Sequence, residues 1–210
     1  MKRLLPFQTI LALGLLLASC TTPVGCAPLA LARVMHYHQF PSTNNWNWTN
    51  IPNTGATQDT YALFNNIHSN LSNICTISYS ITETGIPTTV NLADFLSTYY
   101  SYTHAQRSNY SSYSSYLTIY DELYLYQRPV ILTGCSTDGK AHTWVCDGIH
   151  DYQTCVELDD GSYLVYGHLY FHHAWGLESI NDTWLGYAVS SFVVNGYDLS
   201  ESIKLDHHLY

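Results

Sequence analysis

The chain contains a cysteine and a histidine in surroundings that suit nucleophilic catalysis. Cys26 follows Val24-Gly25 and begins a stretch whose apolar residues recur at the spacing of one helix face up to residue 38. Backbone N–H groups and the positive end of the helix dipole lower the pKa of a thiol at a helix N-terminus. His142 precedes an apolar segment with strand character. An imidazole beside such a thiol can accept its proton and later return it to a leaving group.

The sequence around both residues favours this chemistry over a structural role. By residue type alone, a cysteine at a helix start is more often a small core residue, and a lone histidine before a strand is usually structural. Here the surrounding segments resemble, in the same order, those of the streptopain-like cysteine peptidases, in which V-G-C leads the nucleophile helix. The matching segments cover most of residues 23–187 and are Val24–Pro41, Trp46–Pro52, Glu122–Leu123, Arg128–Gly134, His142–Gly148 and Ala174–Gly176.

The resemblance implies a fold and a mechanism. The expected fold is α+β and papain-like, with a helical half that carries the nucleophile and an antiparallel β-sheet half that carries the histidine; helices followed by strands along the chain agree with it. The implied reaction is peptide-bond hydrolysis by an exported endopeptidase, through Cys26, His142 and a thioester acyl-enzyme. Trp175 matches the family tryptophan that shields the dyad from water. Protein or peptide substrates are expected, and no cofactor.

The sequence departs from the family pattern at three points. Ala174 stands where the family has an asparagine, and alanine cannot orient the imidazole; His173, the nearby substitute, should face the other side of its strand. In the family, a glutamine upstream of the cysteine donates to the oxyanion, and the only glutamine before Cys26 here is Gln8, inside the expected leader. Loss of one oxyanion donor lowers turnover about 10²- to 10³-fold. No family-type propeptide is recognised. The alternative is therefore a catalytically impaired homologue that acts as a lipid-anchored surface or peptide-binding protein.

Substrate preference depends on the residues just before the histidine. In the related enzymes a glycine at this place helps to line the pocket for the second residue upstream of the cut. This chain has Ala141 there, preceded by Lys140. We expect a shallower pocket with a cation at its rim, which prefers small or acidic side chains.

The N-terminus is typical of an export signal. Lys2 and Arg3 precede a short apolar run, Ile10–Leu17, which ends in Leu-Ala-Ser-Cys20. This ending resembles the lipobox of bacterial lipoproteins, in which the cysteine is acylated after cleavage; an ordinary signal peptide is the alternative. The sequence predicts a leader over 1–20, a peptidase domain over 21–210, and a protein of the cell envelope or the secreted fraction. Membrane contact is expected only through an anchor at Cys20.

Composition narrows the classes of partner and cofactor. The 210 residues suffice for one domain, and a formal charge of −9 argues against nucleic acid as a partner. The other cysteines form no C-x-x-C pair, so no metal site is expected. The pairs His172-His173 and His207-His208 do not change this, because adjacent strand residues face opposite ways. Cys146 is expected in the core, and the sequence leaves open any disulfide pairing of Cys75, Cys135, Cys146 and Cys155.

The periodicity predicts further elements along the chain. We expect helices over 57–69, 89–100 and 117–126, and a polar surface loop over 101–115. The expected strands cover 74–81, 130–132, 143–146, 162–166, 168–172 and 187–193, with a hairpin turn at 159–161. The catalytic cleft is expected between the helical and the sheet halves.

Overall fold

The computed structural model describes residues 24–42, 44–52, 55–79, 84–176, 182–186, 192–194 and 197–210. The predicted leader, with Cys20 and Gln8, lies outside these residues. Within them, no helix has both the length and the apolar character needed to cross a bilayer.

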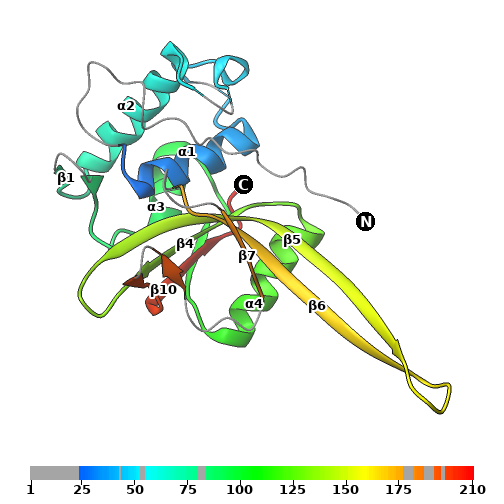
Figure 1. The fold of residues 1–210 in the computed structure, drawn as a ribbon. Coiled ribbons are helices and arrows are strands. Elements are labelled where there is room, and N and C mark those ends of the chain that lie inside the picture. Colours follow the sequence, from blue (N-terminus) through cyan, green and yellow to red (C-terminus); the bar gives the residue numbers. More distant parts are fainter. Residues whose placement is uncertain are drawn as a thin grey trace.

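A six-stranded antiparallel sheet with strand order β3-β10-β4-β5-β6-β7 forms the centre of the molecule (Figure 1). Its longest strands, β5 and β6, pair with each other as a hairpin. Two small hairpins, β1–β2 and β8–β9, lie outside this sheet. The strands are β1 (Ser78–Tyr79), β2 (Thr84–Gly85), β3 (Gln106–Asn109), β4 (Val130–Cys135), β5 (Ala141–Glu157), β6 (Tyr163–Ala174), β7 (Thr183–Gly186), β8 (Val193–Val194), β9 (Tyr197–Asp198) and β10 (Glu201–His207).

Helices cover both faces of the sheet, which confirms the predicted α+β class. On β4, Ile131 packs into a core with α1, α2 and α3, whereas Val130 and Leu132 pack into a second core with α4 and η2. This alternation is the period of two that a strand imposes on its side chains. The helices are α1 (Cys26–His38), η1 (Trp48–Asn50, a 3₁₀ turn), α2 (Gln58–Ser72), α3 (Leu92–Tyr100), α4 (Ser112–Tyr120) and η2 (Asp121–Leu125, a π-helical turn).

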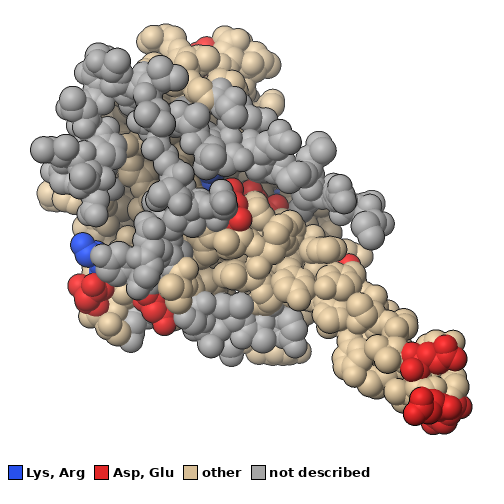
Figure 2. Space-filling view, in the orientation of Figure 1, with Lys and Arg blue, Asp and Glu red and all other residues tan. Residues whose placement is uncertain are grey.

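The β5–β6 hairpin projects far from the rest of the protein (Figure 1). Its turn lies at the expected place, where Leu158 and Ser162 are hydrogen-bonded and Gly161 has φ of 81°. The outer half is exposed, and its end carries the acidic residues Glu157, Asp159 and Asp160, visible as a group in Figure 2. The sequence predicted short separate strands here, because exposure of both faces removes the polar–apolar alternation that marks a strand.

The predicted elements differ from the structure in several places. Residues 101–115, expected to be a loop, contain β3 and the start of α4, and the sheet gains β10, which was not predicted. Near the end of β10, the buried Asp206 forms an ion pair with Arg107 on β3, at 2.7 Å. Such a pair gives a strand little hydrophobic signal. Of the strand expected over 74–81, β1 is present, and most of the one expected over 187–193 lies outside the described residues.

Candidate active site

Cys26 is the first residue of α1, as the sequence predicts. The residue before it, Gly25, has φ of 88° and ψ of 149° and provides no side-chain cap. A positive φ of this size favours glycine, and the absent cap leaves no side chain to compete for the N–H groups of the first turn. The inner face of α1 is buried through Ala27, Leu31 and Val34. This packing holds the helix against the sheet. Cys26 itself remains partly exposed.

His142 is the second residue of β5, at a point where, among the described residues, the strand has a neighbour on only one side. On one side it pairs with Gly134 of β4; on the other side, pairing with β6 begins only at Val145 and Ala174. The start of α1 packs against β5 at this end of the sheet. His142 is buried and forms a hydrogen bond with Cys26. The structure therefore brings together the two residues that the sequence singled out.

The surroundings of Cys26 stabilise a thiolate. Burial alone would raise the pKa of the thiol, but the hydrogen bond and charge of His142 lower it, as do the backbone N–H groups of Thr143 and Ala27. The net shift of the Cys26 pKa is downward. For His142, burial and the Arg33 charge lower the pKa, while the contact with Cys26 and the carbonyl of Trp175 raise it, with a net upward shift. Both shifts favour a thiolate–imidazolium pair.

A backbone carbonyl orients the imidazole. Nε2 of His142 lies 2.7 Å from the carbonyl oxygen of Trp175, which can only accept a hydrogen bond. Nε2 therefore carries the proton, and Nδ1 is the nitrogen left to face Cys26. The expectation that His142 lacks an orienting group is wrong. Ala174 indeed offers no side chain, but the next residue supplies an oxygen from its main chain, which sequence comparison cannot reveal.

Two charged side chains hold the peptide segment that carries this carbonyl. Asp182 accepts a hydrogen bond from the Trp175 N–H at 3.0 Å, and the buried Arg33 donates to the Ala174 carbonyl at 3.0 Å. Arg33 also faces the charges of Asp182 and Asp147, which partly offset the fall of its pKa on burial. These residues were not predicted. The only signal is Arg33 itself, a charged residue on the apolar face of the predicted nucleophile helix.

The two neighbouring histidines have other roles. His172 pairs with Asp147, with 2.6 Å between Nδ1 and Oδ1, and this partner raises its pKa against the effect of burial. His173 accepts a hydrogen bond from Nε1 of Trp144 at 3.0 Å, and burial lowers its pKa to about 3. His173 is thus a neutral core residue. The two side chains point to different partners, as expected for adjacent residues on a strand.

A comparison with protein families identifies the class of enzyme. A family model described as Peptidase C10 family matches residues 42–185, more than half of the chain. The chain belongs to the peptidase C10 family. These are the streptopain-type cysteine peptidases, so the predicted class, hydrolase activity and papain-like α+β fold are confirmed. A comparison with curated proteins finds no match.

The matched range contains one half of the candidate dyad of this C10 peptidase. His142, Ala174 and Trp175 lie within 42–185, whereas Cys26 precedes it. The assignment of Cys26 therefore depends on its position at the start of α1 and on its contact with His142.

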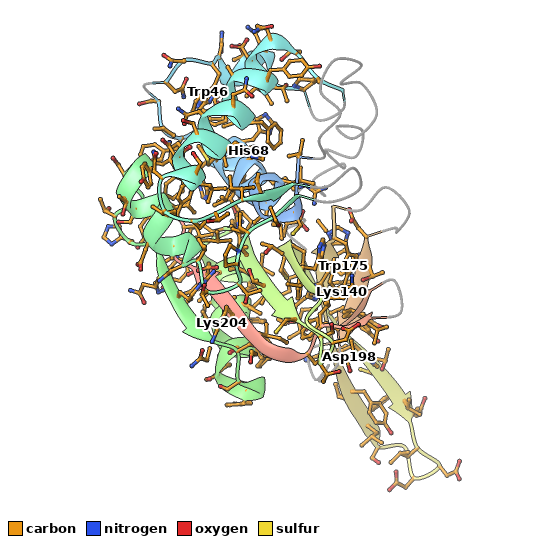
Figure 3. The ribbon with its side chains drawn as sticks, turned by 90° about the vertical axis from the view of Figure 1, so that its left-hand side faces the viewer. Trp46, His68, Lys140, Trp175, Asp198 and Lys204 are labelled. Carbon is orange, nitrogen blue, oxygen red and sulfur yellow. The ribbon has the colours of Figure 1, made fainter. Side chains whose placement is uncertain are left out.

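The remaining predicted site residues of the C10 peptidase lie at the same end of the sheet. Figure 3 shows Trp175 and Lys140 there, and both Lys140 and Ala141 are exposed. Trp175 is buried; its indole donates to Thr183 at 2.9 Å and lies 4.9 Å from the ring of Trp144. The ring stacked on His142 is Trp144, at 6.1 Å and 9°. In the described part of the chain, the cysteines are unbridged, and Cys146 is fully buried as predicted.

Proposed function

We propose that this C10 peptidase hydrolyses peptide bonds with Cys26 as nucleophile and His142 as general acid and base. The observation that carries the proposal is the buried contact of His142 with the thiol at the start of α1, together with the opposite pKa shifts of the two groups. A cysteine kept only for packing would have a raised pKa, as Cys146 does in the same sheet.

The mechanism follows from these contacts. The Cys26 thiolate attacks the carbonyl carbon of the peptide bond, and the protonated His142 gives its proton to the departing amine, which leaves a thioester. His142 then takes a proton from water, whose oxygen attacks the thioester and releases the acid and the thiolate. Throughout, the Trp175 carbonyl keeps the Nε2 proton in place, so that Nδ1 carries the transferred proton.

The first experiment measures the pH dependence of Cys26 alkylation by iodoacetamide, on protein that lacks residues 1–20. We expect labelling to titrate well below the ordinary thiol pKa and to lose this low-pH reactivity in His142→Ala. Cys146→Ser is the matched control, because the buried Cys146 should not contribute to labelling. Titration near the ordinary thiol pKa, independent of His142, would instead support the impaired homologue that binds peptides without cutting them.

The subsite proposal rests on the position of Ala141 and Lys140 next to His142. Ala141 is the first residue of β5, Lys140 directly precedes it, and both are exposed. We expect small or acidic residues at the second position upstream of the cut. A peptide library profiled with the parent and with Lys140→Ala tests this: acidic preference should fall in the variant, and a preference for bulky apolar residues in the parent would contradict the proposal.

We also propose that the protein is exported and anchored by acylation of Cys20, which the sequence alone supports. Five residues separate Cys20 from Cys26, a reach of about 20 Å when extended. An anchored chain would therefore act close to a membrane. Metabolic labelling with a radioactive fatty acid should mark the parent and not Cys20→Ser; release of unlabelled parent into the medium would support an ordinary signal peptide.

A further inference from the structure

A second cluster of side chains with metal-binding chemistry lies at the end of β10. Glu122 of η2, His207 and His208 each offer one ligand atom, and these three atoms lie within 4.8 Å of one another. Glu122 is fully buried, His207 is 8% exposed, and the side chain of His208 is about one-third exposed. We refer to these three residues as the β10 cluster. None of them takes part in the mechanism proposed for Cys26 and His142.

The backbone at His208 brings the two histidine rings together. His207 is the last residue of β10, and His208 has φ of 54°, in the left-handed region. The ring centroids are 4.5 Å apart and the planes meet at 75°. Adjacent residues within a strand face opposite ways, but β10 ends at His207, so this expectation is wrong for His207 and His208.

The hydrogen bonding of the β10 cluster is incomplete. His208 shares a hydrogen bond through Nδ1 with Oε1 of Glu122. Nδ1 of His207, in contrast, has no hydrogen-bond partner among the described residues, although it is buried. A buried polar atom without a partner is costly, and in a native protein it calls for a ligand or another explanation. His207 also supplies one of the three ligand atoms.

The charges around the cluster favour a cation on one side and oppose it on the other. Arg128 forms a bidentate ion pair with Glu122, at 2.8 and 3.0 Å. Its guanidinium also lies over the ring of Tyr210, at 4.0 Å. The charges of Glu122 and Arg128 both act on His38, which ends α1, so the negative end of that helix is close by. The guanidinium weakens binding of a dication without removing the ligands.

We propose that Glu122, His207 and His208 bind a divalent transition metal of the zinc class. Two imidazole nitrogens and one carboxylate oxygen form a donor set that Zn²⁺ accepts, and the exposed edge of His208 leaves a position for water. Nδ1 of His208 becomes a ligand when its proton moves to Nε2, so the hydrogen bond to Glu122 is replaced by the metal. Glu122 keeps Arg128 as its outer partner, as carboxylate ligands commonly keep a second hydrogen bond. The bound metal would connect the end of β10 to η2.

The test uses the chain in a Cys26→Ala background, so that the thiol cannot bind the metal. After chelator treatment, the protein is titrated with Zn²⁺ by calorimetry and with Co²⁺ by visible absorption. We expect one equivalent of Zn²⁺ to bind with a micromolar Kd, and Co²⁺ to give the intense absorption of a tetrahedral site. Metal should also raise Tm, because only the folded chain brings the ligands together.

Matched variants locate the site among the 11 histidines of the chain. His207→Gln and His208→Gln should each weaken Zn²⁺ binding at least about 100-fold, whereas His150→Gln, on the exposed part of β5, should bind like the parent. His208 is the more exposed of the two ligands, so its variant keeps the test valid if His207→Gln does not fold. Absence of Zn²⁺ binding in the parent, or binding by both ligand variants as tight as in the parent, would overturn the proposal.

Discussion

The two ends of α1 place histidines in contrasting environments. At the N-terminal end, one nitrogen of His142 bonds to the Trp175 carbonyl and the ring bonds to Cys26. At the C-terminal end, Nε2 of His38 has no hydrogen-bond partner among the described residues, and the Glu122–Arg128 ion pair acts on it. The helix dipole favours an anion at the first end and a cation at the second. The dipole of this one helix thus suits the thiolate proposed at its first residue and the metal ion proposed near its last.

The largest effect is expected from removal of His142, the proposed general acid and base. His142→Ala should lower kcat/KM for peptide hydrolysis at least about 10³-fold, because it removes both the general base and the group that stabilises the thiolate. His150→Ala changes an exposed histidine of the same strand and is the control. The measurement is hydrolysis of a fluorogenic peptide under reducing conditions. If His142→Ala hydrolysed peptides nearly as fast as the parent, His142 would have no catalytic role and would not differ in this respect from His38.

The next effect concerns the buried cation behind the dyad. Arg33→Met keeps the bulk of the side chain but leaves the Ala174 carbonyl without its donor and Asp147 and Asp182 without a facing cation. Breaking such a buried charge arrangement costs about 3–5 kcal/mol of unfolding free energy. Urea denaturation measures the loss. Lys204→Met, whose amine bonds to Asn109 on the surface, should change stability by less than about 1 kcal/mol. Equal losses in both variants would show that Arg33 has no special role.

Asp182 is expected to affect catalysis only by holding the Trp175 peptide that orients His142. Asp182→Ala removes the acceptor for the Trp175 N–H, so the carbonyl that orients His142 loses part of its support. We expect kcat to fall about 10- to 100-fold with little change in KM. Asp182→Asn keeps an acceptor oxygen and should recover most of the rate. If both variants lose activity equally, the charge of Asp182 matters rather than its hydrogen bond.

A pH measurement contrasts the histidines at the two ends. Burial, assisted by the Arg128 charge, lowers the pKa of His38 to about 4, although Glu122 opposes this. Between pH 6.5 and 4 the unfolded chain then binds more protons than the folded chain, so stability falls as the pH falls. His38→Gln should remove roughly 1–3 kcal/mol of this acid destabilisation; His150→Gln is the control. Denaturant unfolding at pH 7 and pH 4.5 measures it. An unchanged acid dependence in His38→Gln would contradict the neutral state of His38.

Much of the site near Cys26 could be predicted from sequence because short local patterns carry it. The helix spacing after Gly25 and the segment around His142 identified both residues, and the structure brings them into contact. The orienting group could not be found in this way, since it is a main-chain atom of Trp175, held by Arg33 and Asp182. Such support depends on tertiary geometry, not on residue type at a fixed spacing.

The smallest changes in stability are expected from substitutions at the two backbone positions of positive φ that flank α1. Gly25 has φ of 88° before α1, and Gln39 has φ of 47° after it. Gly25→Ala should lose about 1–2 kcal/mol, because a side chain is strained at positive φ, and it should also reduce the rate by shifting Cys26. Gln39→Gly should gain about 0.5–1 kcal/mol, because glycine is favoured after a helix at left-handed φ, with the rate unchanged. Urea unfolding and peptide hydrolysis are measured on both variants. If Gly25→Ala were as active and stable as the parent, the turn at Gly25 would not position the thiol, and the contrast between the two ends would reduce to their charges.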